Sequence, residues 1–237
     1  MNNIQSPEEK KDLMQQKMQL ICNQINHKSN LKINVYKNAA NAFNILDKMS
    51  EKFPDFFRKN FPDSPVIVKY EHNNTQTFSL QFGSDILFFM LHSNVFDFNR
   101  DHEVMKTPYI RDNKDRAYCG LINIYNFLTD SLLYNRCNDA GYLIGRVFIN
   151  IDNHYYIDGK RELGHIYNNF ASAEFTEELA QEVLLSAIQY TYNFDLLVPP
   201  YEVVKEITIQ DMLDIKEKRI PIRTAKRLGF RFHADEL

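Results

Sequence analysis

The chain has 237 residues, of which 44% are hydrophobic and 25% are charged, and its formal net charge is −3. This composition is typical of a globular protein with a sizeable core and excludes a wholly disordered chain. The small negative charge excludes a general attraction to nucleic acid or to anionic membranes. Any such contact must therefore come from a local basic patch.

The sequence lacks both a run of about 18 apolar residues and the pattern of a signal peptide. We therefore expect a cytoplasmic protein without membrane contact. Cys22, Cys119 and Cys137 are odd in number and far apart, which is typical of free thiols in a reducing compartment. We expect each of them to be a small buried side chain.

The first predicted element is a helix over about residues 7–28. Ser6 supplies an N-cap hydroxyl, Pro7 suits the first helical position, and Glu9 complements the helix dipole. Its apolar stripe consists of Met14, Met18, Ile21 and Ile25. We expect this stripe to dock on its own domain, with pairing to another helix as the alternative.

A short strand is predicted at 31–35, followed by a second helix that begins at Asn38 and ends before Pro54. Its apolar face is formed by Ala39, Ala42, Phe43, Leu46 and Phe53. The aromatic segment 55–61 then reads as a short helical turn or a loop.

From Val66 the hydrophobic period changes to two, which predicts an antiparallel meander. Its strands are expected at 66–71, 76–82, 85–92 and 95–98. The third strand contains the sequence ILFFML. Because it is apolar on both faces, we expect both of its faces to be covered.

The polar stretch 100–116 has no periodicity and reads as a mobile crossing loop. A helical stripe follows at Leu121, Ile124, Tyr125, Leu128 and Leu132, although the β-branched and aromatic content leaves a strand possible. A hairpin is predicted from strands at 142–151 and 154–158, with its turn at Asp152-Asn153.

Thr176 is predicted to cap a helix whose apolar face comprises Ala180, Val183, Leu184, Ala187, Ile188 and Thr191. Pro199-Pro200 ends this run, and we expect a strand at 203–209, a short helix from about 210 and a basic tail over 216–237. The whole chain, 1–237, is predicted to be a single α+β domain. Its antiparallel sheet has about five to seven strands and is flanked by three or four helices.

No Walker A loop, GxGxxG, GxSxG or HExxH motif is present, and we predict neither a cofactor nor a metal. The nearest metal-like group comprises His92, Asp97, Asp101, His102 and Glu103. It is the basis of one alternative function, a hydrolase, but neighbouring residues on a strand face opposite ways, which favours a solvated loop.

A ligand site is predicted around the second hairpin, where Arg146 interrupts an apolar strand. If Arg146 is recessed, it needs an anion, or a carboxylate such as Asp139 or Asp158, because an unpaired buried charge is costly. In that case the predicted site for an anionic small molecule or a peptide carboxylate comprises Arg146 as the anchor with Asp158, Arg161, His154 and His165, the two histidines being polar auxiliaries. The alternative is an Arg146 side chain on the wet face of the sheet.

The C-terminal tail interleaves basic and aromatic side chains. A nucleic-acid site is predicted at Arg223, Lys226, Arg227, Phe230 and Arg231, since such side chains can follow phosphates and stack on bases. A charged edge strand fits the same pattern.

At YNRCNDAGYLIGRVFIN, DGKRELG and TAKRLGFRF the chain resembles a family of uncharacterised cytosolic proteins from Bacteroidota-type bacteria. The resemblance covers most of the chain. It implies a bacterial, cytoplasmic, single-chain protein and no activity. We therefore expect a non-catalytic binding or regulatory protein that recognises an anionic ligand or a protein partner, with a nucleic-acid factor and a hydrolase as alternatives.

Overall fold

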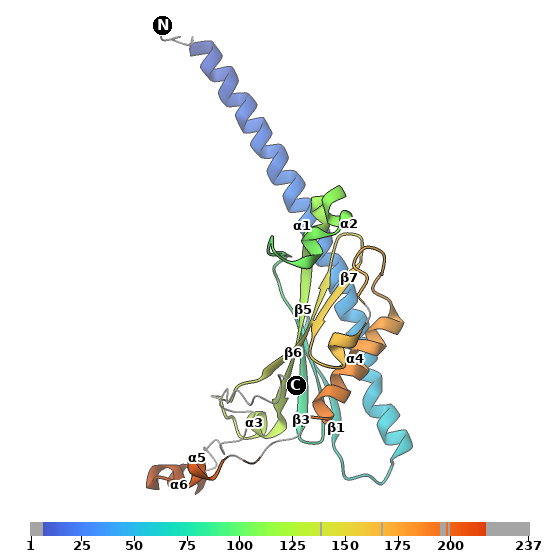
Figure 1. Cartoon of the computed structure of the whole chain (residues 1–237), viewed down its shortest axis with the longest axis vertical. Helices are drawn as coiled ribbons and strands as arrows, with labels where there is room; N and C mark the ends of the chain where they lie inside the picture. Colours follow the sequence, from blue (N-terminus) through green and yellow to red (C-terminus); the bar gives the residue numbers. More distant parts are fainter. Residues whose placement is uncertain (1–6, 138, 167, 195–197, 199, 217–237) are drawn as a thin grey trace.

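The computed structural model describes residues 7–137, 139–166, 168–194, 198 and 200–216. An antiparallel sheet is covered on one face by two helices, the long α1 (Pro7–Asn60) and α4 (Glu177–Tyr192), and α1 extends far beyond the sheet (Figure 1). The shorter helices are α2 (Pro108–Asp112), α3 (Thr129–Leu133), α5 (Tyr201–Val204) and α6 (Ile209–Lys216). The predicted α+β class, with a sheet of this size flanked by helices, is confirmed.

The sheet has the strand order β1-β2-β3-β5-β6-β7, and β4 pairs with β5. The strands are β1 (Val68–Asn74), β2 (Thr77–Phe82), β3 (Asp85–Leu91), β4 (Phe96–Asp97), β5 (Tyr118–Leu128), β6 (Tyr142–Ile149) and β7 (Tyr155–Gly159). All pairs are antiparallel. The predicted meander is confirmed for β1, β2 and β3, and so is the hairpin that turns at Asp152-Asn153, with strand ends shifted by a few residues. The strand predicted at 95–98 does not extend the meander, because β4 pairs with β5 and not with β3.

Helix α1 replaces three predicted elements. The expected helix end near Lys28, the strand at 31–35 and the separate helix from Asn38 are wrong, because 54 residues form one helix. Leu31 and Val35 are 8% and 0% exposed, whereas Ile33 between them is 52% exposed. A strand would place all three side chains on one face, so the burial follows the helical spacing of four.

Two other predictions of local structure need correction. Stretch 100–116 is not an irregular loop, because it contains two short 3-10 helices, Glu103–Lys106 and Lys114–Ala117, on either side of α2. The helical stripe expected over 121–132 is mainly strand β5, the alternative that the β-branched and aromatic residues allowed.

The strand expected at 203–209 is also wrong, since α5 covers Tyr201–Val204 and α6 begins at Ile209. Segment 55–61, expected as a turn or loop, mostly belongs to the last turns of α1, and Pro54 lies inside that helix. Thr176 caps α4 as predicted, accepting a hydrogen bond from the backbone N–H of Leu179 at 3.3 Å.

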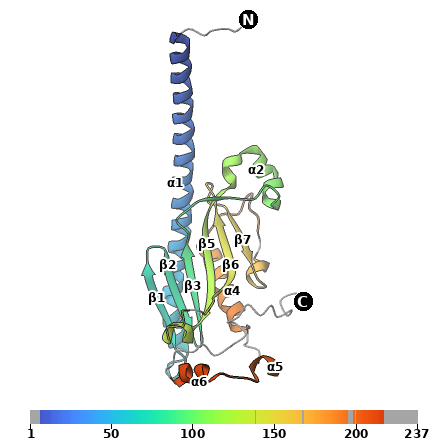
Figure 2. The same ribbon diagram turned by 90° about the vertical axis from the view of Figure 1, so that its left-hand side faces the viewer.

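The main core lies between the sheet and the two helices behind it (Figure 2). Aromatic rings fill its centre, where Phe78 stacks on Phe89 with centroids 4.6 Å apart and also contacts Phe43 at 5.1 Å. Helix α1 crosses β5 at a point where the helix and the strand both have small residues. A Cβ atom added at Gly120 would lie 2.3 Å from the Cβ of Ala39, so the helix approaches the strand backbone directly.

A second, smaller apolar cluster lies on the opposite face of the sheet near α2. It comprises Val104, Ile110, Ala117, Cys119, Leu121, Phe148 and Phe170. Farther along this face the cover ends, and Met90 is 41% exposed. The prediction that both faces of the third strand are covered is therefore wrong at Met90, while Leu87 and Phe89 on the helix side are fully buried.

The exposed thiols differ from the prediction. Cys119 is buried, but Cys22 and Cys137 are exposed, and all three are free thiols. Among the described helices, none combines the length and apolarity needed to span a membrane.

A side chain hydrogen-bonds to the backbone groups at one edge of the sheet. On β7, the Asn168 side chain accepts a hydrogen bond from the N–H of Ile157 and donates one to the Ile157 carbonyl, both at 2.7 Å. This amide thus takes the place of a neighbouring strand. The other edge strand, β1, exposes Lys69, Glu71 and His72, and charged side chains discourage further pairing.

The close crossing of α1 over β5 predicts that an added methyl group at Gly120 destabilises the fold. Gly120→Ala should destabilise the fold by about 1–3 kcal/mol, because the added methyl group overlaps Ala39 and overpacks the crossing. Chemical denaturation with the circular dichroism of the helices as readout measures this. The double variant Gly120→Ala with Ala39→Gly should regain part of the loss, offset by the helix cost of glycine. A double variant no more stable than Gly120→Ala would contradict the overlap.

Candidate functional site

The N-terminal half of α1 projects from the rest of the molecule (Figures 1 and 2), and near its base Nε2 of His27 lies 3.0 Å from the carboxylate of Asp115. We call residues 11–30 the projecting segment, and every residue in it is exposed. Its stripe residues Met14, Met18 and Ile25 are about equally open, at 60%, 61% and 60%, and Ile21 is 44% exposed. The expectation that this stripe docks on its own domain is therefore wrong for the described structure.

The exposed stripe continues the spacing of the buried part of α1. Apolar residues lie at 14, 18, 21 and 25, and buried ones at 35, 39, 42 and 46, so both sets alternate steps of four and three. In the second set the sheet covers the stripe. The first set has the same amphipathic pattern, which in helices normally accompanies a packed face.

Local interactions support the helix in the projecting segment. It contains neither glycine nor proline, and side-chain amides pair one turn apart, from Gln19 to Asn23 and from Asn30 to Asn26, each at 3.0 Å. Such pairs contribute a few tenths of a kcal/mol each. The segment is thus a continuous helical extension whose surface is mostly polar outside its stripe, with Leu13 and Leu20 as further exposed apolar residues, at 56% and 58%.

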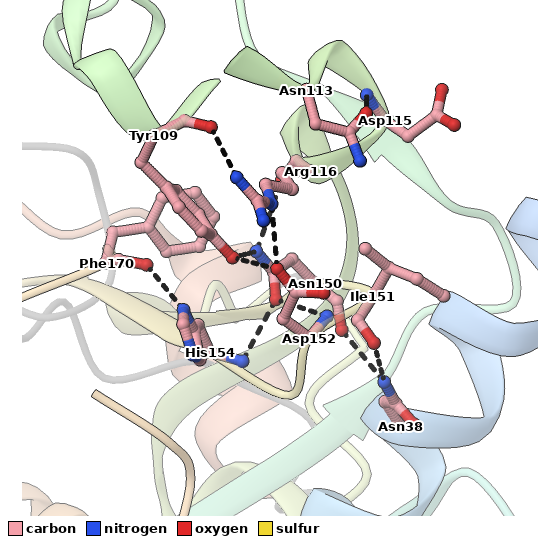
Figure 3. Close-up of polar contacts among 10 residues, drawn as sticks. All are labelled: Asn38, Tyr109, Asn113, Asp115, Arg116, Asn150, Ile151, Asp152, His154 and Phe170. Carbon is pink, nitrogen blue, oxygen red and sulfur yellow. Dashed lines mark hydrogen bonds and ion pairs between the residues drawn. The ribbon is translucent and has the colours of Figure 1, made fainter. Parts of the chain in front are cut away.

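A polar junction lies where α1 leaves the sheet (Figure 3). We define it as Asn38, Tyr109, Arg116, Asn150, Asp152 and His154. Asn38 of α1 donates hydrogen bonds to the carbonyls of Asn150 and Ile151, at 3.0 and 2.8 Å. These bonds attach the helix to the β6-β7 turn just below the projecting segment.

Asp152 is the charged centre of the junction. Its carboxylate accepts hydrogen bonds from the Tyr109 hydroxyl at 2.6 Å and from Nε of Arg116 at 2.9 Å. Arg116 also covers the Tyr109 ring, 4.4 Å from its centroid. Fully buried Asn150 donates to the Tyr109 hydroxyl and accepts from the N–H groups of Asp152 and His154. The carboxylate therefore already has partners in the described structure.

Tyr109 and His154 stack with ring centroids 5.3 Å apart. The His154 Nδ1 atom lies 3.1 Å from the carbonyl of Phe170, so this nitrogen carries the proton. Burial raises the pKa of the Tyr109 hydroxyl above its usual range, and the hydrogen bond to Asp152 raises that pKa further. Tyr109 thus serves as a neutral donor in this junction.

The residues of the predicted ligand site are spread over the β6-β7 region. Arg146 pairs with Asp158 on the neighbouring strand, with Nε 3.0 Å from the carboxylate, and the two side chains are 43% and 48% exposed. His154 belongs to the polar junction at the turn. Arg161 and His165 are exposed beyond β7, and Arg161 has a φ of 41°.

Of the two carboxylates considered for Arg146, Asp158 is the one it meets. Asp139 instead accepts a hydrogen bond from the Ser131 hydroxyl at 2.7 Å and lies 3.9 Å from Arg136. The Arg146 guanidinium also lies over the Phe148 ring at 5.4 Å. This geometry matches the wet-face alternative for Arg146.

The histidines of the 92–103 group have local partners. Nδ1 of His92 accepts from the N–H of Asn94 at 3.0 Å, and Nδ1 of His102 accepts from the N–H of Val104 at 3.3 Å. Among the described residues, no group of three or more histidines, cysteines or carboxylates could hold a metal ion. The predicted nucleic-acid residues Arg223, Lys226, Arg227, Phe230 and Arg231 lie outside the described residues.

An apolar groove that no sequence pattern indicated lies at the other end of α1. Its volume is about 620 Å³, and its lining includes Phe53, Phe57, Phe82, Gly83, Ile188 and Tyr192. These residues come from α1, the β2-β3 hairpin and α4. No sequence motif unites them, because only the fold brings the three elements together; the high aromatic content was the one available signal.

Comparison with family models, with curated proteins and with solved structures finds no match for this chain. The resemblance to a Bacteroidota-type family therefore stays a prediction.

The raised pKa of Tyr109 predicts a stability change in alkaline solution. A free tyrosine ionises near pH 10, so stability from this hydroxyl is complete below about pH 10 and declines as the pH rises above it. Tyr109→Phe should lower the unfolding free energy by about 1 kcal/mol at pH 8. Between pH 8 and pH 11 the unfolding free energy of this variant should fall by less than that of the wild type. Tyr192→Phe, at a 76% exposed site, is the control and should match the wild type at both values. An unchanged pH dependence in Tyr109→Phe would contradict this role.

The exposed pair of Arg146 predicts little effect on stability. Arg146→Met should change the unfolding free energy by less than about 1 kcal/mol, because exposed ion pairs contribute little. Arg116→Met is the matched substitution and should cost more, since Arg116 bonds both Asp152 and the Tyr109 carbonyl. Thermal unfolding of both variants measures the difference. A larger loss for Arg146→Met would reinstate a structural role for that arginine.

Proposed function

We propose that this protein is a non-catalytic binding protein and that its projecting segment recognises a protein partner through an apolar, helix-to-helix interface. The observation that carries the proposal is the uncovered stripe of Met14, Met18, Ile21 and Ile25. Isolated exposed apolar residues are ordinary, but a periodic row along a helix is the arrangement that a second helix fits.

The energetics of helices support this reading. Most helical stability in proteins comes from packing of the apolar face, and a helix in water without such packing is marginal. We call the sheet and the elements packed on it the body. In the described structure the body packs on the apolar face of α1 from Leu31 onward and not along residues 11–30. A partner helix would supply the missing contacts.

The shape of the segment suits recognition away from the body. Twenty helical residues extend about 30 Å at 1.5 Å per residue, and the helix is continuous with the core. The polar junction holds the base of this extension through Asn38. The segment would therefore present its stripe in a fixed direction, which reduces the entropy lost on binding.

We place the protein in the cytoplasm of a bacterial cell. The exposed free thiols of Cys22 and Cys137 suit a reducing compartment. The resemblance stated from the sequence is the basis for the bacterial source.

Site-specific photo-crosslinking tests the recognition surface. A photoreactive amino acid at Met18 should yield a discrete covalent adduct in cells that express the protein, because this side chain would lie within the interface. The same group at Gln16, two residues away and on the opposite face of the helix, is the control and should yield little adduct.

Charge substitutions give the matched loss of function. Met18→Glu with Ile21→Glu should abolish the adduct from a probe at Met14, whereas Gln16→Glu with Asn23→Glu adds the same charge on the outer face and should leave it intact. Equal labelling from positions 16 and 18, or no labelling from either, would contradict the proposed function.

A further inference from the structure

We infer that the partner of the projecting segment is a second copy of this chain, paired with it in antiparallel orientation. This inference rests on the proposed function and names the partner for the same surface. Three independent features of the segment support it: the match of its apolar residues, its length and the distribution of its charges.

Each apolar layer contains one methionine and one isoleucine only when the two helices run in opposite directions. A two-fold axis between Met18 and Ile21 sets Met14 opposite the second copy's Ile25, and Met18 opposite its Ile21. All four layers then contain one methionine and one isoleucine, so their volumes are equal. Parallel pairing would give layers of two methionines and layers of two isoleucines, which differ in shape.

We call the row of four apolar layers the seam, and a lysine layer bounds it at each end. In the same register the layer beyond the four apolar ones sets Lys11 opposite the second copy's Lys28. Lys28 is already turned toward the body, where its ammonium group lies 5.5 Å from the centroid of the Tyr118 ring. The seam therefore has four apolar layers, and the body begins where the seam ends.

The length of the segment matches the antiparallel arrangement. The same two-fold axis places Pro7, the first residue of α1, opposite Lys32, next to Leu31 where α1 first becomes buried. Each helix would thus end where the other copy's body begins, and the two bodies would lie at opposite ends of the pair. A parallel partner would instead approach Val35, where the sheet already covers the stripe.

The net charges of the two ends are opposite in this orientation, while the layer itself sets Lys11 opposite Lys28. Residues 8–12 carry three carboxylates and two ammonium groups, and residues 27–32 carry two ammonium groups and no carboxylate. Antiparallel pairing brings the net negative end of each helix to the basic end of the other. It also opposes the two helix dipoles, which favours association.

The positions that flank the seam allow a direct test of direction. In an antiparallel pair, Gln15 lies beside the second copy's Cys22 on one side of the seam, and Lys17 lies beside its Gln24 on the other. In a parallel pair, residues 15 and 22 of different copies are separated by about two helical turns, roughly 10 Å. A thiol at position 15 would therefore reach Cys22 only in the antiparallel pair.

The first experiment measures the oligomeric state of the purified full-length chain by analytical ultracentrifugation. We expect a monomer-dimer equilibrium in the micromolar range, because four layers form a small interface. Met18→Glu with Ile21→Glu should be monomeric throughout, and Gln16→Glu with Asn23→Glu should dimerise like the wild type. Thermal unfolding of the body checks that the variants are folded.

The second experiment measures direction by disulfide formation under mild oxidation in a Cys137→Ser background. Gln15→Cys should yield a covalent dimer through Cys22, whereas Gln16→Cys and the background alone should stay largely uncrosslinked. A dimer that depends on Met18 and Ile21 but gives no crosslink from Gln15→Cys would overturn the antiparallel orientation.

The outcomes separate this inference from the proposed function. A chain that is monomeric at all concentrations, while the photoreactive group at Met18 labels a different protein, overturns the second copy and leaves the proposed function standing. A dimer that is unaffected by Met18→Glu with Ile21→Glu, together with no labelling from Met18, overturns both.

Discussion

The close crossing of α1 over β5 is the contact on which the rest of the structure depends. Because Gly120 has no side chain and Ala39 has a small one, the helix axis lies near the strand backbone at the middle of the sheet. This approach lets Phe43 reach Phe78 and the aromatic core behind it. The same helix then continues beyond the ends of the strands, so the position of the projecting segment follows from the packing of the core.

The sequence was informative where one physical signal acted alone. Strands β1 and β2 alternate polar and apolar side chains between clear turns, and β3 is a short apolar run bounded by turns. The helix after Thr176 has both a cap and a clean apolar face. Local chemistry decides such elements, and the bounds of β2 and β3 were predicted to within one residue. Strand β1 begins two residues later than predicted, and α4 ends at Tyr192, before Pro199-Pro200. The α+β class followed from the order of these elements along the chain.

Prediction failed where tertiary contacts decided between local alternatives. The spacing of Leu31, Ile33 and Val35 fits a strand, whereas Leu31 and Val35 without Ile33 fit a helix, and only the position of the sheet selects the helix. Over 118–128 the opposite occurred, since pairing with β3 and β6 selected a strand for a segment with helical spacing. The stripe at Met14 to Ile25 was recognised, but the sequence could not reveal that α1 carries it beyond the reach of its own sheet.

The sequence also singled out residues of the candidate sites without indicating which partners they contact. Individual side chains such as Arg146 and His154 could be singled out as chemically notable, but their partners come from β7 and from the carbonyl of Phe170. The polar junction joins residues from four separate stretches of the chain, including Asn38 and Tyr109. Such networks depend on distances across the fold, which a linear pattern does not contain.

The occupied edges of the sheet have a consequence for the behaviour of the protein at high concentration. Open edge strands are the usual starting point of cross-β aggregation, because their free N–H and C=O groups can template another chain. Here the Asn168 amide holds both groups of Ile157 on β7, and β1 exposes charged side chains. Contacts between molecules are thereby directed away from backbone pairing and toward side-chain surfaces, where specificity can be encoded residue by residue.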